Sequence, residues 1–435
     1  MMLIVAIEHS NIHRRMALKL LLIFGCSHYR LSFLIFFTSM ILSMWVSNVL
    51  ACGIMMPIVK AILAELETMG ILEVYHPIRK SNRRNSYQEQ SPPRPTEFTI
   101  FYFLGIAYSS SIGSMATIMG SQANQIFKIY CETIFPIGPK IEFPHFMLLN
   151  LPGVLVMETM LYMWLNFYFL GMFRAQSEIA LEIGLTEEEA QYINTLLDTQ
   201  FKQLGRIKFH EVIVGTLVAL AAILQPTITA SRIENYDLKL HNHLIISSPC
   251  FICVVLLFII PREISILKLF KRRRHSGGSS ALFQSLKDSS MTDEFGKFLT
   301  LFKSWPSSAI ILVIIIFCKI LTEFASNSTV VYCMLPSIAK FSFICHVNPH
   351  YFMLASTLIS SLPFHLVTGA PINALVCAYM HIPPWKMMYV GIGPSVIGIV
   401  VTWFTVSAWS TAIWPDISHD PDWANVSIFN RNITT

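Results

Sequence analysis

Two short polar motifs with matched spacing interrupt long apolar stretches of this 435-residue chain. The motif Ser47–Val49 reads Ser-Asn-Val and Pro57 follows its serine by ten residues, while Ser326–Ser328 reads Ser-Asn-Ser and Pro336 follows at the same distance. Amide and hydroxyl donors at the start of a helix can hold an anion, and carbonyl oxygens freed from a helix can coordinate a cation. The repeated spacing predicts an internal repeat with two such tips.

Two further polar stretches, Ser109–Asn124 and Thr368–Asn373, break otherwise apolar segments, and each ends in an asparagine. Irregular polar backbone at membrane depth is tolerated only where it is buried in protein or lines a cavity. For one break alone we favour the simpler interpretation that Ser, Gly and Thr are small residues at helix contacts. Four breaks in two matched pairs instead indicate a secondary transporter with inverted repeats and a site near the midplane for an anionic solute and a coupled cation.

The composition shows which kind of scaffold must position these breaks. Hydrophobic residues make up 54% of the chain and charged residues 13%, about half the share expected of a soluble domain. Since about 20 apolar residues cross a bilayer, the long uncharged stretches predict an all-α polytopic membrane protein. These stretches are Leu31–Val59, Phe98–Phe127, Val212–Ser231, Leu244–Pro261, Phe341–Trp385 and Met387–Pro415, joined by Phe146–Phe173 with only Glu158 inside. The net charge of +5 lies in a few clusters, so we expect no nucleic-acid partner.

The basic clusters Arg79–Arg84 and Lys271–Arg274 predict two cytoplasmic loops. Four crossings lie between them, which places both clusters on one side, and an amphipathic helix over Thr186–Gly205 is expected on the cytoplasmic surface. Counting the membrane crossings after Arg274 places the C-terminus in the cytoplasm. The glycosylation acceptors Asn425 and Asn432, however, must lie on the opposite side of the membrane to be modified. We therefore expect that a crossing is missing between Arg274 and Trp305.

At these motifs the chain resembles the divalent anion:sodium symporters, the animal sodium-dependent di- and tricarboxylate and sulfate carriers. The resemblance runs over nearly the whole chain, although it begins within a membrane helix, so the first helices of the family are expected to be missing. It is carried by Leu42–Pro57, Ala107–Gly113, Leu321–Ser328, Pro371–Ala374 and Asp422–Asn425. It implies a homodimeric, elevator-type carrier of citrate and succinate in the plasma membrane, with two re-entrant hairpins and two broken helices. Transport would be coupled to sodium or proceed by exchange.

The resemblance also implies site residues. Sodium would bind at two cation sites, the first made by Ser43, Ser47, Asn48 and Gly113, and the second by Thr322, Ala325, Asn327 and Gly369. Substrate carboxylates would bind at Ser47, Asn48, Val49, Ser326, Asn327 and Ser328. No cofactor other than these coupling ions is expected. Several positions depart from the family pattern, among them Val49 in place of a threonine, Ser114 in place of a glycine, and Gln122-Ala123 and Gly369-Ala370 in place of the usual residues.

Nine segments follow from this resemblance. They are a remnant of N-terminal membrane helices at 1–30, the first hairpin and first broken helix at 31–131, a membrane helix at 132–185, the amphipathic helix at 186–208, scaffold helices at 209–262, a cytoplasmic basic linker at 263–304, the second hairpin and second broken helix at 305–381, a final membrane helix at 382–415 and an extracellular tail at 416–435.

Glu323 and Glu158 are ionisable residues at membrane depth. For Glu323 we favour a helix pair with Lys319 over a substrate contact, and for Glu158 a packing contact through a threonine or tyrosine hydroxyl over proton coupling. A truncated, non-transporting or regulatory variant of such a carrier remains an alternative, as does sulfate as the substrate. An intramembrane enzyme is disfavoured, because the few ionisable groups at membrane depth form no catalytic set.

Overall fold

The computed structural model of the chain describes three long stretches: 28–68, 94–170 and 298–414. It also describes 15–19, 22, 73–75, 195, 198–199, 201–203, 211–217, 219–220, 296, 417, 421 and 423. Within these residues the named elements are helices, and the β pairing is a single isolated bridge between Tyr75 and Pro95. The all-α prediction is confirmed for the described part of the chain.

The helices fall into two groups along the sequence. The first comprises α3 (His28–Trp45), α4 (Asn48–Thr68), α5 (Glu97–Met115), α6 (Gln122–Ile134) and α7 (Phe143–Leu170). The second comprises α14 (Ser307–Phe324), α15 (Asn327–Ile344), α16 (Pro349–Ser360), α17 (Pro371–Met380), α18 (Pro384–Val390), α19 (Ile392–Phe404), the π-helical turn η3 (Thr405–Trp409) and α20 (Ser410–Ile413).

Among the described residues, five helices are long and apolar enough to cross a membrane, which supports a multi-pass membrane protein. They are Asn48–Thr68, Glu97–Met115, Phe143–Phe169, Ser307–Phe324 and Ile392–Ile413. Of the predicted crossing Val212–Ser231 only 212–217 and 219–220 are described, and they are helical. The crossing Leu244–Pro261, both basic clusters and most of the amphipathic segment Thr186–Gly205 lie outside the described residues.

Each Ser-Asn motif forms the turn of a helical hairpin. The chain passes from α3 to α4 through Val46 and Ser47, and from α14 to α15 through Ala325 and Ser326. Ser326 caps α15, because its hydroxyl oxygen accepts a hydrogen bond from the Thr329 amide at 3.3 Å. The second arms, α4 and α15, begin at the motif asparagines and contain the matched prolines. The structure therefore confirms that the two motifs occupy equivalent positions.

The other two polar stretches also form breaks, but their limits differ from the prediction. Helix α5 continues through the serines to Met115, and the backbone leaves helical geometry only at 116–121. Serine is tolerated here because its hydroxyl can bond back to its own helix, as Ser111 does to the Ala107 carbonyl at 3.0 Å. The second break spans 361–370 and begins well before Thr368, since Pro363 has no amide hydrogen for a continuing helix.

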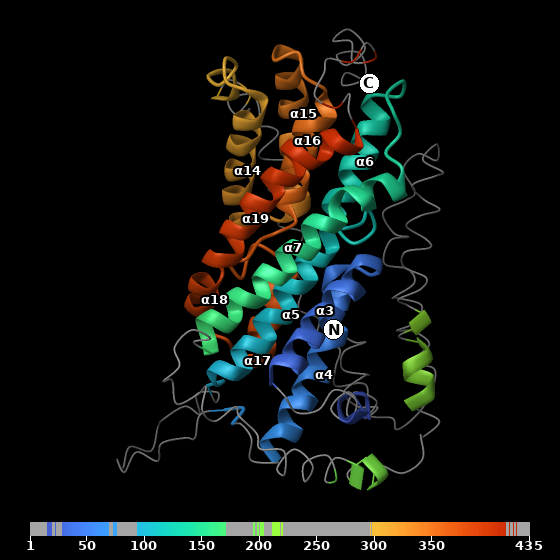
Figure 1. Cartoon of the computed structure of the whole chain (residues 1–435), viewed down its shortest axis with the longest axis vertical. Helices are drawn as coiled ribbons and strands as arrows, with labels where there is room; N and C mark the ends of the chain where they lie inside the picture. The colour runs from blue at the N-terminus through green and yellow to red at the C-terminus, as the bar shows by residue number, and fades with distance from the viewer. Residues whose placement is uncertain are drawn as a thin grey trace, which may run out of the picture.

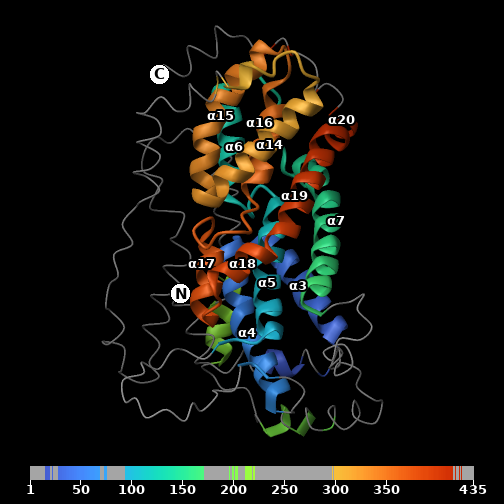
Figure 2. The ribbon, with the colours of Figure 1, turned by 90° about the vertical axis from the view of Figure 1, so that its left-hand side faces the viewer.

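The two halves are arranged as an inverted pair. In Figure 2 the second hairpin lies in the upper half of the molecule with α16 and α6, and the first hairpin lies in the lower half with α5 and α17. The contacts agree: α6 packs on α15 and α16, whereas α17 packs on α4 and α5. Each broken helix therefore starts beside its own hairpin and ends beside the other one, so both breaks lie midway along the molecule (Figure 1).

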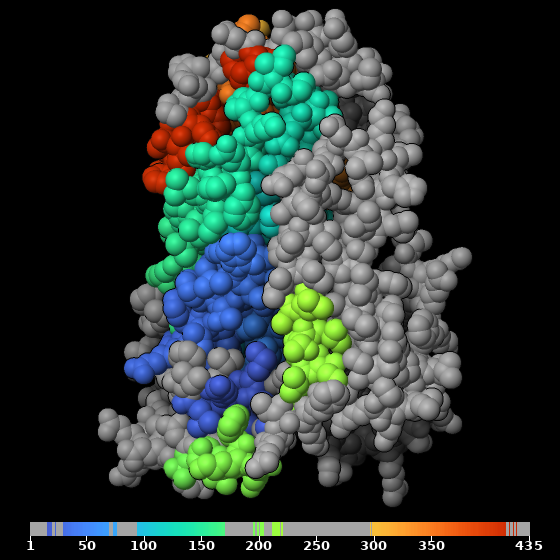
Figure 3. Space-filling model, turned by 90° about the vertical axis from the view of Figure 1, so that its right-hand side faces the viewer, coloured from blue at the N-terminus to red at the C-terminus, as the bar shows by residue number. Residues whose placement is uncertain are grey.

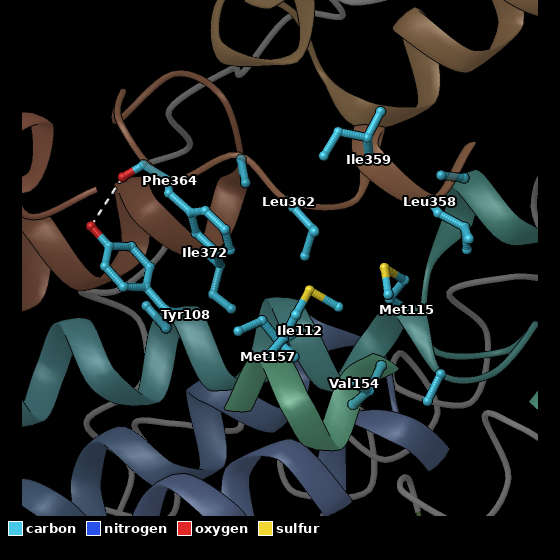
Figure 4. Packing of buried hydrophobic residues seen from close by; sticks show 14 of the residues in the cluster. Tyr108, Ile112, Met115, Val154, Met157, Leu358, Ile359, Leu362, Phe364 and Ile372 are labelled. Carbon is cyan, nitrogen blue, oxygen red and sulfur yellow. Dashed lines mark hydrogen bonds between the residues drawn. The ribbon is translucent and has the colours of Figure 1, made fainter. Parts of the chain in front are cut away.

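The breaks are packed against each other by a buried apolar cluster, shown in Figure 4. Tyr108 and Ile112 of α5 face Phe364 and Leu362 in the second break, and Met115 lies beside Leu358 at the end of α16. The Tyr108 hydroxyl donates to the Phe364 carbonyl at 3.0 Å. This contact ties the first broken helix to the unwound backbone of the second.

Helices α7 and α19 pack side by side through close approaches at glycine. A Cβ on Gly393 would lie 2.1 Å from the Trp164 ring, and one on Gly153 would lie 2.6 Å from the Thr405 hydroxyl. The outer face in Figure 3 includes α7 in green and α3 in blue. The exposed large side chains of α7 are mostly apolar, as expected of a surface that contacts lipid or other membrane helices; they are Leu148, Leu155, Val156, Met160, Met163, Phe167 and Tyr168.

Candidate functional site

The two hairpin tips present helix N-termini whose first residue is an asparagine. Asn48 begins α4 and Asn327 begins α15, and both side chains are half-buried. Their neighbours Ser47, Val49, Ser326 and Ser328 are half-buried as well. Unpaired backbone amides and the helix dipole make such an N-terminus favourable for a carboxylate. Partial exposure leaves these tips accessible to a solute.

The residues of the predicted first cation site come from α3 (Ser43), the hairpin turn (Ser47), the start of α4 (Asn48) and α5 (Gly113). The Ser43 hydroxyl donates to the Ser110 carbonyl at 2.5 Å. Gly113 lies where α5 crosses α3, because a Cβ there would fall 2.2 Å from the Met40 carbonyl oxygen. Asn48 is locally engaged, since its Oδ1 accepts from the Val49 amide at 2.8 Å.

Around the second tip, the corresponding residues of α14, α15 and the second break contact one another. The Thr322 hydroxyl donates to the Ser360 carbonyl at 2.9 Å and lies 3.4 Å from Asn327 Oδ1. A Cβ on Gly369 would meet the carbonyl oxygens of Thr322 and Glu323 at 3.1 and 3.2 Å. The glycine therefore lets the second break approach the end of α14, where a cluster of carbonyl oxygens forms. Such a cluster is the oxygen environment that a hard cation prefers.

The structure adds Gly120 to the residues that sequence reasoning selected. A Cβ on Gly120 would lie 2.8 Å from the Ser43 carbonyl oxygen and 2.7 Å from that of Ser114. Gly120 precedes Asn124 by four residues, as Gly369 precedes Asn373, and Ser43 and Thr322 each precede their tip serine by four. Gly120 is therefore the spatial counterpart of Gly369. These two shared spacings of four residues are the sequence signal that could have identified Gly120.

Two buried asparagines hold the unwound segments in place. Asn124 donates to the Thr117 carbonyl at 2.8 Å, across the first break. Asn373 donates to the Pro363 and Leu366 carbonyls at 3.2 and 3.1 Å, across the second. The sequence identified these asparagines as the ends of the breaks but gave them no role. Their amide groups replace the helical donors that the break removes.

Glu323, near the end of α14, holds the backbone of the second break in place. Its carboxylate pairs with Lys319, with 2.5 Å between Nζ and Oε1, and both side chains are buried. The same carboxylate accepts the backbone amides of Phe364, His365 and Leu366 at 3.0, 3.0 and 3.1 Å. The predicted Lys319–Glu323 pairing is confirmed, and the carboxylate also fixes the loop that faces the second tip.

Hydroxyl groups join the two halves at the breaks. Ser328 at the second tip donates to Gln122 Oε1 at the start of α6, at 2.9 Å. Ser121 and Ser361, one from each break, lie 2.9 Å apart at their hydroxyl oxygens. The second tip is therefore brought to the first broken helix. Gln122 departs from the family pattern, and in this chain its amide supplies a polar contact at the tip.

These features have the form of a carrier site, and comparison with known proteins identifies the family. A family model described as "Citrate transporter" matches residues 1–359. The chain belongs to the citrate transporter family. Members of that family are carriers rather than enzymes, as the names of the relatives also indicate.

Individual members of the citrate transporter family align with almost the whole length of this chain. "Protein I'm not dead yet" of Drosophila melanogaster is 31% identical, covering 98% of this chain and 77% of the relative. The human "Na(+)/dicarboxylate cotransporter 3" is 25% identical, over 99% and 81%. The rat "Na(+)/citrate cotransporter" is 23% identical, over 98% and 83%. The resemblance inferred from the hairpin motifs is thereby confirmed.

Other predicted features of this family member lie outside the described residues. They are the glycosylation acceptors Asn425 and Asn432 and most of the segments 1–30, 186–208, 209–262, 263–304 and 416–435.

Proposed function

We propose that this chain is a secondary active carrier that moves citrate and succinate across the plasma membrane, driven by sodium symport or by exchange. The observation that carries the proposal is the pair of equivalent hairpin tips, each starting a helix with asparagine beside the break of a crossing helix. Family membership and relatives named as citrate and dicarboxylate cotransporters support the substrate class.

In the proposed mechanism, the substrate carboxylates bind the amides and hydroxyls of Ser47–Val49 and Ser326–Ser328. Sodium ions bind the oxygens around Ser43, Ser47, Asn48 and Gly113 and around Thr322, Ala325, Asn327 and Gly369. Gly120 belongs to the first group, because its backbone approaches the Ser43 carbonyl as Gly369 approaches that of Thr322. A cation beside two carboxylate-binding tips lowers the cost of burying a negatively charged solute.

The proposed motion is of the elevator type. The hairpins, acting as re-entrant elements, and the broken helices move together against scaffold helices at a homodimer interface, with the C-terminal tail outside. The packing of each broken helix on both hairpins supports motion of these elements as one body. Their connection through Tyr108 and Phe364 supports it as well.

The experiment is uptake of labelled citrate and succinate by proteoliposomes that contain only this chain, with and without a sodium gradient. Asn48→Ala and Asn327→Ala should each abolish substrate binding and uptake, because each removes a tip amide. Thr159→Ala is the matched control, since Thr159 is an exposed residue of α7 whose hydroxyl bonds its own helix. Full binding in either asparagine variant would refute the site.

The same vesicles separate the alternatives. Folded wild-type protein that takes up neither substrate would favour the truncated, non-transporting variant of the carrier. Uptake of labelled sulfate that excess unlabelled sulfate suppresses and excess citrate does not would favour sulfate as the substrate.

A further inference from the structure

One ionisable side chain at the centre of the fold is not used by the proposed mechanism. Glu158 lies in the middle of the 28-residue helix α7 and is 3% exposed. Its Oε1 accepts a hydrogen bond from the Ser109 hydroxyl of α5 at 2.7 Å. Its Oε2 is buried and has no hydrogen-bond partner among the described residues. An ionised carboxylate in this position would hold a charge with one oxygen unsatisfied, and binding a proton removes that charge.

The helices packed against α7 bring no described basic group to this carboxyl. Helices α19, η3 and α20 contain no titratable residue at all. On α5 the candidates are Glu97 at its start, Tyr102, and Tyr108, whose hydroxyl donates to the Phe364 carbonyl. On α3 the candidates stand in its first turn: His28, Tyr29 and the exposed Arg30.

On α7 itself, three other residues can titrate. The Tyr162 hydroxyl donates to the Tyr29 carbonyl at 2.8 Å, and Tyr168 is exposed. His145 pairs with Glu142 at the exposed start of the helix. No described cation therefore offsets a charge on Glu158.

Glu158 is also connected to the first candidate cation site. Its partner Ser109 is followed directly by Ser110, whose carbonyl accepts the hydroxyl hydrogen of Ser43. Two hydrogen bonds and one peptide unit thus connect the carboxyl to a residue proposed to hold sodium. Within a low-dielectric interior, a negative charge on Glu158 attracts a cation there, and its neutralisation by a proton removes that attraction.

We propose that Glu158 is a proton-binding site linked to the first cation site, so that a proton on Glu158 weakens sodium binding. The inference rests on the proposed function and adds a coupled ligand to it. The proton comes from water, binds one carboxylate oxygen and returns to water, so no other reactant is needed. By reciprocity, bound sodium favours loss of this proton.

The test measures sodium affinity as a thermal shift of the purified protein at about pH 6 and about pH 8, the range in which buried carboxyls gain protons. For the wild type, sodium affinity should be weaker at the lower pH by about tenfold, within the usual range of coupled sites. Glu158→Gln imitates the protonated carboxyl and should bind sodium weakly at both pH values. Glu142→Gln, which alters an exposed carboxyl next to the same helix, should keep the wild-type ratio.

A second variant and a second readout guard against misfolding of Glu158→Gln. Ser109→Ala keeps the carboxyl but removes the hydroxyl that stabilises its charged form, so the carboxyl should stay protonated at both pH values and the affinity ratio should fall toward one. The infrared band of a protonated carboxyl, seen in the wild type at the lower pH, should diminish in Glu158→Gln. A wild-type ratio in Glu158→Gln or Ser109→Ala, an unchanged band, or no sodium effect in the wild type would each overturn the inference. Citrate binding in the same samples reports separately on the proposed function.

Discussion

Replacement of Glu323 by glutamine tests how the second break is held. Glu323→Gln keeps the shape of the side chain but removes its charge, leaving Lys319 buried without its partner. It also weakens acceptance of the amides of Phe364, His365 and Leu366, because a glutamine offers one oxygen where the carboxylate offers two. Breaking a buried pair from one side typically costs 3–5 kcal/mol, and the retained oxygen places the expected loss near the lower end, at about 3 kcal/mol.

The assay is thermal unfolding of the purified protein in detergent. With about 1 °C lost per kcal/mol in a chain of 435 residues, the melting temperature of Glu323→Gln should fall by about 3 °C. Adding Lys319→Met should recover part of this loss, because the double variant no longer buries an unpaired ammonium group. Lys319 also donates to the Leu362 carbonyl, so recovery should be incomplete.

Asp198→Asn provides the matched control. Asp198 and Lys202 have the same four-residue spacing but are largely exposed, so their pair should contribute less than about 1 kcal/mol. A Glu323→Gln protein that melts like Asp198→Asn would refute the assigned role. A double variant whose loss equals the sum of the two single losses would refute the coupling of Lys319 and Glu323.

Two further substitutions address the second break and the first tip. Asn373→Ala removes two hydrogen bonds across the second break, each worth about 1 kcal/mol, and should lower the melting temperature by about 2 °C. An unchanged value would mean that other contacts hold the loop. Val49→Thr adds a hydroxyl to the half-buried first tip and should strengthen citrate binding by about fivefold, or about 1 kcal/mol, in a titration of the purified protein. Equal or weaker affinity would show that other groups compensate for the valine.

The hairpins were predictable because their signal is local. An apolar arm, a Ser-Asn turn and an internal proline at fixed spacing define each one, and the structure places α4 and α15 as that pattern indicates. The Lys319–Glu323 pair was likewise predictable, since residues four apart share a helix face.

The breaks were less predictable because tertiary contacts determine where a helix stops. The serines of α5 look like a break in the sequence, but the hydroxyls of Ser111 and Ser114 bond within the helix and the helix continues. The approach of Gly120 to the Ser43 carbonyl oxygen and the contact between Gln122 and Ser328 each join elements that are far apart in the chain. No spacing within one segment reveals such an approach.

The three loop amides that converge on Glu323 have a consequence for how the protein can diverge in sequence. The carboxylate accepts hydrogen bonds from backbone amides, so these bonds do not depend on which side chains stand at positions 364–366. Mutations at the half-buried positions 365 and 366 can therefore accumulate while the path of the backbone stays the same, whereas Phe364 is also held by its buried ring against Tyr108. Loss of Glu323 would change the path of the backbone, whichever side chains stand at positions 364–366.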